Sequence, residues 1–313
     1  MALKVTALAG GVGGAKLAHG LARILPQESL TVIVNTGDDF THLGLSISPD
    51  VDTVVYTLAE LSDQERGWGR GNESFHALDV VRQLGGESWF RLGDLDLGLH
   101  LQRTTLLRRG IPLSEVTQAF CEAWNVPAAI LPMTDDLVRT IVETPEGDLP
   151  FQEYFVARGC EPRVRGFRFE GLANAAAAPG VYASLEEADI VIICPSNPWV
   201  SIDPILGIKG VRERLVEKKV IAVSPIIAGK AVKGPAAAMY ADLGIEPSAL
   251  AVAAHYQGIL EAIVIDRTDA ALREEIERLG IQVFLSETIM KSIEDRIRLA
   301  EEVIDFAGME SGL

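Results

Sequence analysis

The sequence predicts an α/β fold: a Rossmann-like, mainly parallel sheet with helices on both faces and an inserted, largely helical subdomain. Short apolar runs rich in β-branched residues alternate with helix-like segments near both ends of the chain, which is typical of such sheets. From about residue 62 to residue 171 that rhythm gives way to consecutive helical stretches. We therefore predict a core made of residues 1–61 and 172–313, with residues 62–171 as an inserted capping subdomain.

The N-terminal segment predicts a βαβ unit. Lys4–Ala9 has the pattern of a buried strand, Ala15–Leu25 that of a helix with one apolar face, and Leu30–Asn35 that of a second strand. Glycines separate the first strand from the helix, as this unit requires. Val51–Leu61 is then expected to be a helix, with Asp50 as its N-cap after Pro49.

The middle of the chain predicts helices and then a short β-rich patch. The expected helices are Glu73–Leu84, Leu97–Arg109 and Ser114–Trp124, and the expected β segments are Ile130–Pro132, Arg139–Glu143 and Phe151–Val156. We place all six in the capping subdomain.

Alternation returns in the last third of the chain. The expected strands are Asp189–Cys194, Val220–Ser224, Ala249–Ala254, Ala262–Ile265 and Gln282–Leu285. The expected helices are Arg212–Glu217, Pro235–Leu243, Asp269–Leu279 and Ile293–Ala307. Strands that alternate with helices indicate a mainly parallel sheet covered on both faces.

Composition narrows the functional class. The net charge of -16 disfavours a nucleic-acid binder, which would normally carry a basic face. An anionic ligand would need backbone N–H groups, a few placed Arg or Lys side chains, or a bridging divalent metal ion. The three cysteines form no CxxC pair, which favours reduced thiols. Neither a signal peptide nor a run of ~18 apolar residues is present, so we expect no membrane partner and a cytoplasmic location.

The first strand is followed by a glycine-rich loop, Gly10–Gly14. Backbone N–H groups of Gly11, Gly13 and Gly14 at a helix N-terminus would suit a phosphate, with Lys16 adding charge. The loop matches neither the Walker A spacing nor a complete GxGxxG, because Lys16 stands where the last glycine would be. A plain tight turn is the alternative.

The second strand is followed by Asn35, Thr36, Gly37, Asp38 and Asp39. Adjacent acids next to a bound phosphate usually hold Mg²⁺ or accept hydrogen bonds from hydroxyl groups. Asp50 and Asp52 come about a dozen residues later. For Asp50 and Asp38 the alternative to a ligand role is that Asp50 caps a helix and Asp38 is solvated. For Asp39 and Asp52 we favour a functional role.

Four further loops carry polar groups. Trp89–Asp96 would bind a flat polar ring or form a packed turn, and Pro132–Asp136 would be a ligand loop or a capped turn. Pro195–Ser201, with Ser196 and Asn197, suits polar ligand contacts. Ser224–Lys230, followed by Lys233, would bind a nucleotide phosphate or be a solvated loop. Arg103 and Thr104 could add a phosphate contact. Because ligands bind beyond the carboxyl ends of parallel strands, we expect these loops to meet at one edge.

The five histidines are scattered, with no HExxH motif and no Ser/His/Asp order. A zinc hydrolase and a serine hydrolase are therefore disfavoured. An NAD-dependent dehydrogenase is disfavoured too, because the dinucleotide motif is incomplete and no catalytic His or Lys–Tyr pair can be assigned.

Taken in order, these loops resemble the 2-phospho-L-lactate transferase family, which makes the deazaflavin coenzyme F(420). The segments are GGVGGAK, NTGDD, SPDVDT, WFRLGDLD, the Arg103–Thr104 pair, PMTDD, FQEYFV, CPSNPWVSI and SPIIAGKAVKGPA, from about Val5 to Ala236. The resemblance implies a Rossmann-like core with an inserted, largely helical subdomain. It also implies a reaction in which the deazaflavin FO is joined to a guanylyl-activated phospho-acid, with release of GMP and a requirement for Mg²⁺.

The resemblance also implies roles for individual residues. Asp52 and Arg91 match positions that bind FO, although some relatives carry Lys in place of Arg91, with a different donor geometry. Asn35 and Thr36 would lie at the same site, and Asp39 would contact the metal or a hydroxyl group. Either Asp39 or Asp52 would orient the attacking hydroxyl or accept its proton. The residues expected to face the phosphates and the guanylyl donor are Gly11, Gly13, Gly14, Lys16, Ser196, Asn197 and Lys230.

Several points stay open at this level. The donor could carry lactate, enolpyruvate or glycerate, and the resemblance suggests a homodimer. The main alternative is a non-catalytic nucleotide- or sugar-nucleotide-binding regulator of a related Rossmann-like family, which shares the glycine-rich opening. The enzyme hypothesis requires Gly13, Asp52, Arg91 and Asn197 to surround one pocket.

Overall fold

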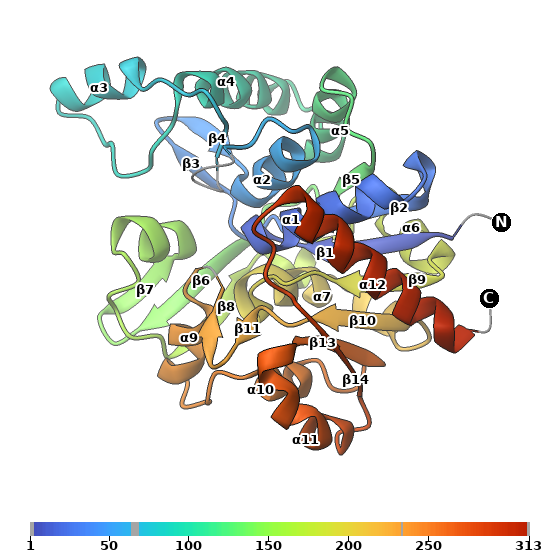
Figure 1. Cartoon of the computed structure of the whole chain (residues 1–313). Coiled ribbons are helices and arrows are strands. Elements are labelled where there is room, and N and C mark those ends of the chain that lie inside the picture. Colours follow the sequence, from blue (N-terminus) through green and yellow to red (C-terminus); the bar gives the residue numbers. More distant parts are fainter. Residues whose placement is uncertain (1–2, 64–68, 233, 312–313) are drawn as a thin grey trace.

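A seven-stranded sheet, parallel throughout, forms the centre of the computed structural model (Figure 1), which describes residues 3–63, 69–232 and 234–311. In spatial order its strands are β14 (Gln282–Ser286), β13 (Ala262–Asp266), β10 (Lys219–Val223), β9 (Ile190–Ile193), β1 (Val5–Ala9), β2 (Leu30–Val34) and β5 (Ala129–Pro132). The predicted fold class is confirmed.

The strand order reverses beside β1. The chain runs outward from β1 to β2 and β5, then returns to place β9 on the other side of β1. In register, Ala9 of β1 lies beside Val34 of β2, and Leu8 lies beside Ile193 of β9. Such a reversal opens a crevice at the carboxyl ends of the two diverging strands, where open α/β sheets bind ligands.

Alternate residues of each strand supply two separate cores. In β1, Ala7 and Ala9 pack on one face of the sheet and Leu8 on the other. The first face is covered by α1 (Gly11–Ile24), α2 (Pro49–Leu58) and α12 (Ile293–Ser311). Gly20 lets α1 and α12 approach closely, because a Cβ there would lie 2.1 Å from the carbonyl oxygen of Arg296.

The opposite face is covered by short helices. They are α6 (Val181–Glu187), α7 (Asp203–Gly207), α8 (Val211–Leu215), α9 (Ala236–Asp242), α10 (Ala249–His255) and α11 (Arg273–Glu277). Coverage on both faces accounts for the apolar runs without polar alternation in the strands.

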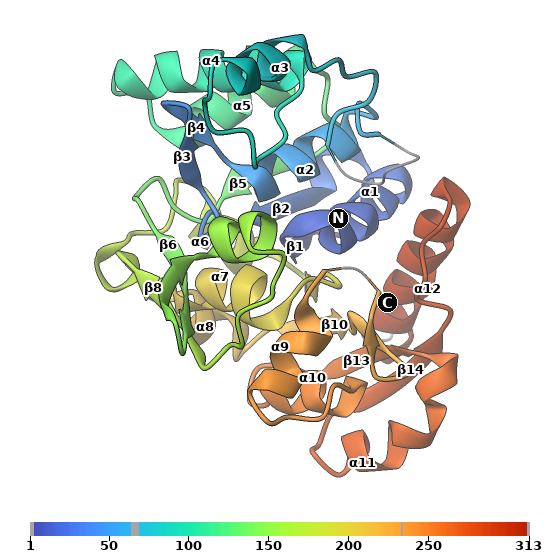
Figure 2. The same cartoon turned by 90° about the vertical axis from the view of Figure 1, so that its left-hand side faces the viewer.

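The segment 62–171 is more varied than the predicted cap. Its first part is helical, with α3 (His76–Gln83), α4 (Asp94–Arg108) and α5 (Leu113–Ala123) above the hairpin of β3 (Phe40–His42) and β4 (Leu45–Ile47) (Figure 2). The predicted placement of Ile130–Pro132 in the cap is wrong, because β5 pairs with β2 in the central sheet. The chain then forms a separate antiparallel sheet of β7 (Gly147–Pro150), β6 (Arg139–Thr144) and β8 (Gly166–Glu170).

Two predicted strands are helical. Phe151–Val156 enters a π-helical turn, Glu153–Ala157, which buries Phe151 and Tyr154 on one side because residues three apart share a helical face. Ala249–Ala254 belongs to α10, where the Ser248 side chain accepts a hydrogen bond from Ala251 N at 3.1 Å and caps the helix. In both segments the apolar residues could be buried by a strand or by a helix. The residues that flank the apolar run determine which of the two forms.

Short elements complete the fold. They are the hairpin β11 (Ile226–Ile227) and β12 (Lys230–Ala231), the π-helical turn Pro198–Ile202, and the 3-10 turns Gln27–Ser29, Leu172–Asn174 and Arg267–Leu272. Within the described part of the chain, no helix combines the length and apolar character needed to cross a bilayer.

Candidate functional site

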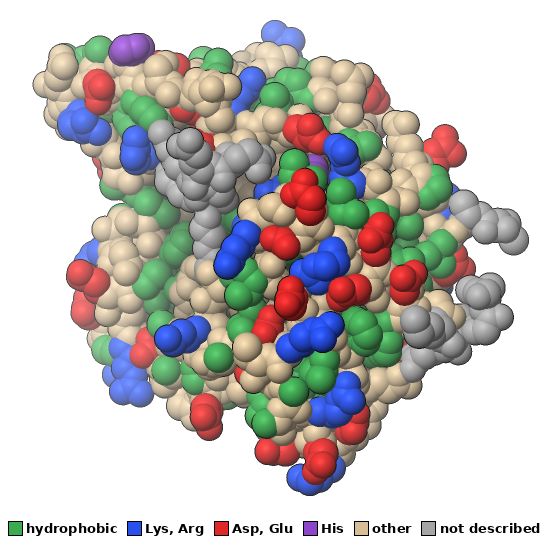
Figure 3. Space-filling view, in the orientation of Figure 1, with side chains coloured by type: hydrophobic (Ala, Val, Ile, Leu, Met, Phe, Trp, Pro, Cys, Tyr) green, Lys and Arg blue, Asp and Glu red, His purple; other side chains and the backbone are tan. Residues whose placement is uncertain are grey.

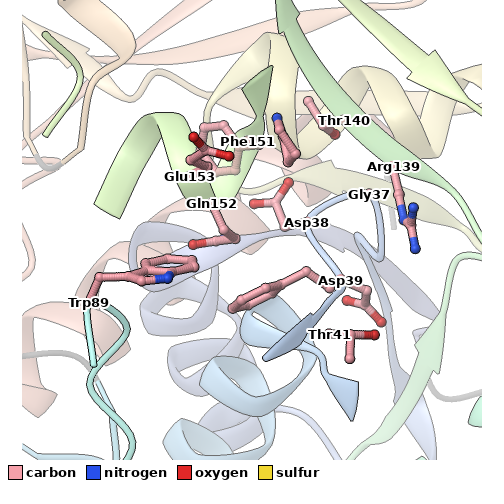
Figure 4. Close-up of a pocket in the computed structure, with 12 residues that line it drawn as sticks. Gly37, Asp38, Asp39, Thr41, Trp89, Arg139, Thr140, Phe151, Gln152 and Glu153 are labelled. Atoms are coloured by element: carbon pink, nitrogen blue, oxygen red, sulfur yellow. The ribbon is translucent and has the colours of Figure 1, made fainter. Parts of the chain in front are cut away.

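A pocket of about 280 Å³ lies at the carboxyl end of β2, where three parts of the chain meet. The loop after β2 supplies one wall, Trp89 from the segment before α4 the second, and the start of β6 with the turn after β7 the third (Figure 4). The lining residues are Gly37, Asp38, Asp39, Phe40, Thr41, Trp89, Arg139, Thr140, Pro150, Phe151, Gln152 and Glu153. In Figure 3 the outline of the molecule is indented between the part that carries α3 and the part that carries β7.

The wall from the helical segment is aromatic. The rings of Phe40 and Phe90 meet edge to face with centroids 4.9 Å apart, and His42 and Trp89 do so at 5.0 Å. Phe40 also lies 5.9 Å from Trp89. These contacts connect the hairpin after β2 to the segment before α4, and Trp89 presents a flat surface to the pocket.

Two carboxyl groups after β2 face the opposite side of the pocket. Burial is the main cause that raises the pKa of Asp38 and of Asp39 well above the ordinary value of a carboxyl group, and the nearby Asp50 charge adds to the effect at Asp38. Ser48 Oγ donates a hydrogen bond to Asp39 Oδ2 at 2.6 Å. The other oxygen of Asp39, and Oδ1 of Asp38, have no hydrogen-bond partner among the described residues.

Two hydroxyl groups add to this set of unpaired polar atoms. Oγ1 of Thr36 and Oγ1 of Thr140 are also buried without a partner in the described part of the chain. An unpaired buried polar atom costs about 1–3 kcal/mol, so native proteins keep few of them. Their concentration beside one pocket indicates that a ligand or ordered water completes the site.

The residues present fit a magnesium ion only if substrate provides part of its shell. The described residues contain no group of three or more His, Cys, Asp or Glu side chains arranged to hold a metal. Mg²⁺, however, often uses one or two carboxylates and takes its remaining ligands from water and phosphate. The free oxygens of Asp38 and Asp39 suit that arrangement.

Asn35 connects three loops behind the pocket. Its Nδ2 donates to Asp50 Oδ2 at 2.9 Å and to the Val200 carbonyl at 3.1 Å, while its Oδ1 accepts from Gly37 N at 2.8 Å. The side chain is fully buried, so its polar atoms are already used by the protein. The predicted contact of Asn35 with FO is therefore not supported by its geometry.

Asp50 has a different role from the predicted N-cap. The N-cap position belongs to Ser48, and Asp50 lies in the first turn of α2, bonded to Asn35 and to the backbone of Gly11. Burial raises the pKa of Asp50 to about 6, although both hydrogen bonds act in the opposite direction. Asp50 thus joins the glycine-rich loop to the loop after β2.

Asp52 points into the helical cap and is not among the pocket-lining residues. Both of its oxygens accept hydrogen bonds from the Arg103 guanidinium, with Arg103 Nη1 to Asp52 Oδ2 at 3.0 Å. His100 Nδ1 lies 3.2 Å from the same Arg103 nitrogen, and burial lowers the pKa of His100 to about 4. Arg103 is therefore paired with Asp52 and does not take the phosphate position considered for it.

The glycine-rich loop packs directly on the loop after β9. A Cβ at Gly13 would lie 2.2 Å from the Pro195 carbonyl oxygen, and one at Gly14 would lie 2.5 Å from Ser196 Oγ. Gly10 N donates to Ser196 Oγ at 3.1 Å. The two predicted loops do meet at the switch point of the sheet, but here they contact each other.

Polar groups of the loop after β9 are also hydrogen-bonded within the protein. Asn197 Oδ1 accepts from Trp199 N at 3.1 Å and from Val200 N at 3.4 Å, which caps the turn Pro198–Ile202. Lys16 donates to the Met290 carbonyl at 2.8 Å. The ligand roles predicted for Lys16 and Asn197 are thus not supported by the contacts of their side chains.

Arg91 and Lys230 lie outside the pocket lining. The Arg91 guanidinium stacks over the Phe75 ring at 4.4 Å and is exposed, and Lys230 is exposed in the β11–β12 hairpin. Lys233, also predicted for a phosphate, is outside the described residues. The structure therefore brings Gly13 near Asn197, but it does not place Asp52 or Arg91 in the pocket.

Sequence reasoning missed part of the pocket wall. Arg139, Thr140, Gln152 and Glu153 line it without having been assigned a role. The FQEYFV segment did carry a signal, because Phe151, Gln152 and Glu153 belong to it. For Arg139 no local signal existed, since a single arginine at the start of a strand is typical of a solvated edge.

The chain is similar to known transferases over nearly its whole length. The family "2-phospho-L-lactate transferase CofD" matches residues 5–294. The chain is 41% identical over 295 residues to a 2-phospho-L-lactate transferase of Methanosarcina mazei, covering 94% of this chain and 97% of that protein. It is 39% identical to a phosphoenolpyruvate transferase of Streptomyces griseus, covering 97% and 98%. A crystal structure of a UPF0052 family protein from Bacillus halodurans has the same fold, with a TM-score of 0.64 and 14% identity over 97% of this chain and 99% of that one.

Proposed function

The chain belongs to the 2-phospho-L-lactate transferase CofD family, and from this premise we propose that it joins a phospho-acid to the deazaflavin FO and releases GMP, in coenzyme F(420) biosynthesis. It is a transferase of the 2-phospho-L-lactate transferase type, with relatives of about 40% identity over almost the full chain. A non-catalytic regulator, the alternative from sequence, is no longer favoured. The acceptor FO, the release of GMP and the pathway are the proposal.

The single observation that carries the proposal is the pocket beside β2. It combines a flat aromatic wall at Trp89 with two carboxylate oxygens, of Asp38 and Asp39, that have no partner among the described residues. A tricyclic ring suits the first feature, and a metal-bound phosphate suits the second. The volume lies near the lower end for small-molecule sites, so the pocket would hold the reacting ends of two substrates.

The proposed step is a displacement at phosphorus. The terminal ribityl hydroxyl of FO attacks the phosphorus that bears the organic acid, a new P–O bond forms, and the bond to the GMP oxygen breaks. The hydroxyl proton leaves to a carboxylate, and GMP departs as a phosphate monoester. Such transfers depend on positioning and charge neutralisation and need no covalent enzyme intermediate.

We propose Asp39 for the role closest to the chemistry, as the ligand of Mg²⁺ or the group that orients the hydroxyl. Mg²⁺ would neutralise charge on the donor phosphates. Asp39 lines the pocket and is held by Ser48, and its other oxygen is buried without a hydrogen-bond partner among the described residues. Asp52 is less suited to proton transfer, because both of its oxygens are engaged by Arg103. Its role in binding FO stays a prediction.

The test is a reconstituted reaction. The purified protein is incubated with FO, Mg²⁺ and guanylyl-activated phospholactate, and the products are separated by chromatography and identified by mass. We expect GMP and a glutamate-free F(420) product in equal amounts, and neither after chelation of Mg²⁺. Donors with enolpyruvate and glycerate, run in parallel, identify the acid. Absence of GMP with all three donors would reject the proposal.

The other expectations on this chain stay proposals. A homodimer is tested by light scattering on the eluted protein, and a cytoplasmic location by fractionation of the producing cells. Neither outcome affects the chemistry proposed above.

A further inference from the structure

Arg139 differs from the other residues around the pocket. Of the described residues that line it, Arg139 is the only one with a cationic side chain, and three of the others are the acids Asp38, Asp39 and Glu153. The guanidinium is exposed and forms no ion pair with a described residue. In Figure 4 it extends toward the side of the pocket where Asp39 and Thr41 lie.

The backbone holds Arg139 in place. The next residue, Thr140, donates its N–H to the Gly37 carbonyl at 2.7 Å, which ties the start of β6 to the loop that carries the two acids. The contact is close, since a Cβ at Gly37 would lie 2.7 Å from Thr140 Oγ1. The backbone of Arg139 therefore has a defined position relative to the loop that carries Asp38 and Asp39.

The neighbouring acid across the small sheet is already engaged. Glu170 of β8 pairs with Arg139 in the strand register, but its carboxylate accepts a hydrogen bond from Arg168 at 2.6 Å. Arg168 is also bonded to Asp148 at 2.8 Å, so Glu170 belongs to a cluster centred on another arginine. The guanidinium of Arg139 remains available for an anion in the pocket.

A cation and two carboxylates that face one pocket without pairing suit a substrate with two kinds of group. The carboxylates suit a metal-bound phosphate, and the planar fork of a guanidinium matches a carboxylate with two parallel hydrogen bonds. The relatives act on 2-phospho-L-lactate or phosphoenolpyruvate, and these compounds share one carboxylate next to the phosphate-bearing carbon.

We propose that Arg139 binds the carboxylate of the organic acid in the donor and selects donors that carry one. The inference rests on the proposed function, which supplies the phospho-acid donor. Because lactate, enolpyruvate and glycerate all have this carboxylate, Arg139 distinguishes acids from neutral analogues and leaves the choice among the three acids to the rest of the pocket.

The experiment measures donor binding without turnover. Calorimetry with Mg²⁺, in the absence of FO, compares guanylyl-activated phospholactate with its carboxamide analogue, which keeps both phosphates. The variants are Arg139→Ala and Arg139→Lys, with Arg165→Ala as the control, since Arg165 is an exposed arginine of the same subdomain outside the pocket. Circular dichroism confirms that each variant is folded.

We expect the wild type to bind the acid roughly 10- to 100-fold more tightly than the amide, as for loss of a charge-assisted pair. Arg139→Ala should bind both donors with the affinity of the wild type for the amide. Arg139→Lys should retain part of the preference, and the control all of it.

Three results would overturn the inference: a wild type without preference, an Arg139→Ala variant that keeps the preference, or one that weakens both donors equally. The last result would assign Arg139 to a phosphate. A separate assay with FO follows GMP release. If no GMP is released while the arginine-dependent preference holds, the proposed transfer fails and the carboxylate contact stands.

Discussion

The loops after β1 and β2 begin on adjacent strands, yet they are packed in opposite ways. The glycine-rich loop after β1 lies against the loop after β9, where Gly10 N donates to Ser196 Oγ and Gly13 meets the Pro195 carbonyl. The loop after β2 borders the pocket, and Asp38 and Asp39 each keep an oxygen without a partner among the described residues. One region satisfies its own polar groups, and the other does not.

This difference indicates that the loop after β1 positions the site, whereas the loop after β2 contacts the ligand. Close packing of the glycine loop on the loop after β9 fixes the geometry of the switch point, and Asn35 and Asp50 transmit that geometry to the loop after β2. The unpaired oxygens are where binding a ligand gains most, because they have already lost their hydration. We therefore expect substitutions beside β2 to affect turnover and those beside β1 to affect stability.

The largest effect is expected at Asp39. Asp39→Asn removes charge from the side of the pocket proposed to bind the metal, and should lower kcat by roughly 10²- to 10⁴-fold. Stability should change little, because Ser48 can still donate to the amide oxygen. The measurement is steady-state GMP release, with Asp79→Asn on the exposed face of α3 as the control. Near-normal turnover in Asp39→Asn would remove Asp39 from the mechanism.

Arg103→Leu should mainly destabilise the fold. It leaves the Asp52 carboxylate buried and unpaired, which costs about 3–5 kcal/mol. Urea unfolding measures the loss, and the double variant Arg103→Leu with Asp52→Asn should recover part of it. If Asp52→Asn alone keeps full stability but loses turnover, Asp52 acts on substrate and the comparison above is wrong.

The raised pKa of Asp50 should make the stability of the protein depend on pH. Burial raises its pKa from 3.8 to about 6 in the folded protein, so its contribution to stability is complete below the unfolded pKa and is lost as the pH rises through 6. The stability of the wild type relative to Asp50→Asn should therefore fall by about 2 kcal/mol between pH 4 and pH 7. Urea unfolding at several pH values measures this difference. A difference independent of pH would mean that Asp50 is not perturbed.

The smallest effect is expected in the packed crevice. Gly13→Ala places a Cβ against the Pro195 carbonyl and should cost about 1–3 kcal/mol of stability. Gly98→Ala is the matched control, because open space surrounds that position in α4, and it should add up to about 1 kcal/mol. Thermal unfolding of the two variants compares them. Equal stabilities would show that the crevice is loose enough to admit a ligand.

Local pattern was sufficient for the outline of the fold and for part of the site. The β-branched runs predicted β1, β2, β9, β10, β13 and β14, since a strand buried on both faces must be apolar along its length. The loop Asn35–Asp39 was predicted as functional because adjacent acids next to a bound phosphate usually hold Mg²⁺ or accept hydrogen bonds from hydroxyl groups. Phe151–Val156 and Ala249–Ala254 were predicted wrongly, because a short apolar run suits a strand or a helix equally.

The sequence alone determined the parallel α/β sheet and the position of the acids after β2, because each depends on residues adjacent in the chain. Only the tertiary structure decided which polar groups remain unpaired. Asp52 lies in a motif with the same acidic character as the loop of Asp39, yet Arg103, from 51 residues further along, engages both of its oxygens. The position of Arg139 beside the pocket could not be predicted from the sequence, because it depends on the hydrogen bond that joins the start of β6 to Gly37. Pairing between distant segments depends on how they pack together, and no local pattern records it.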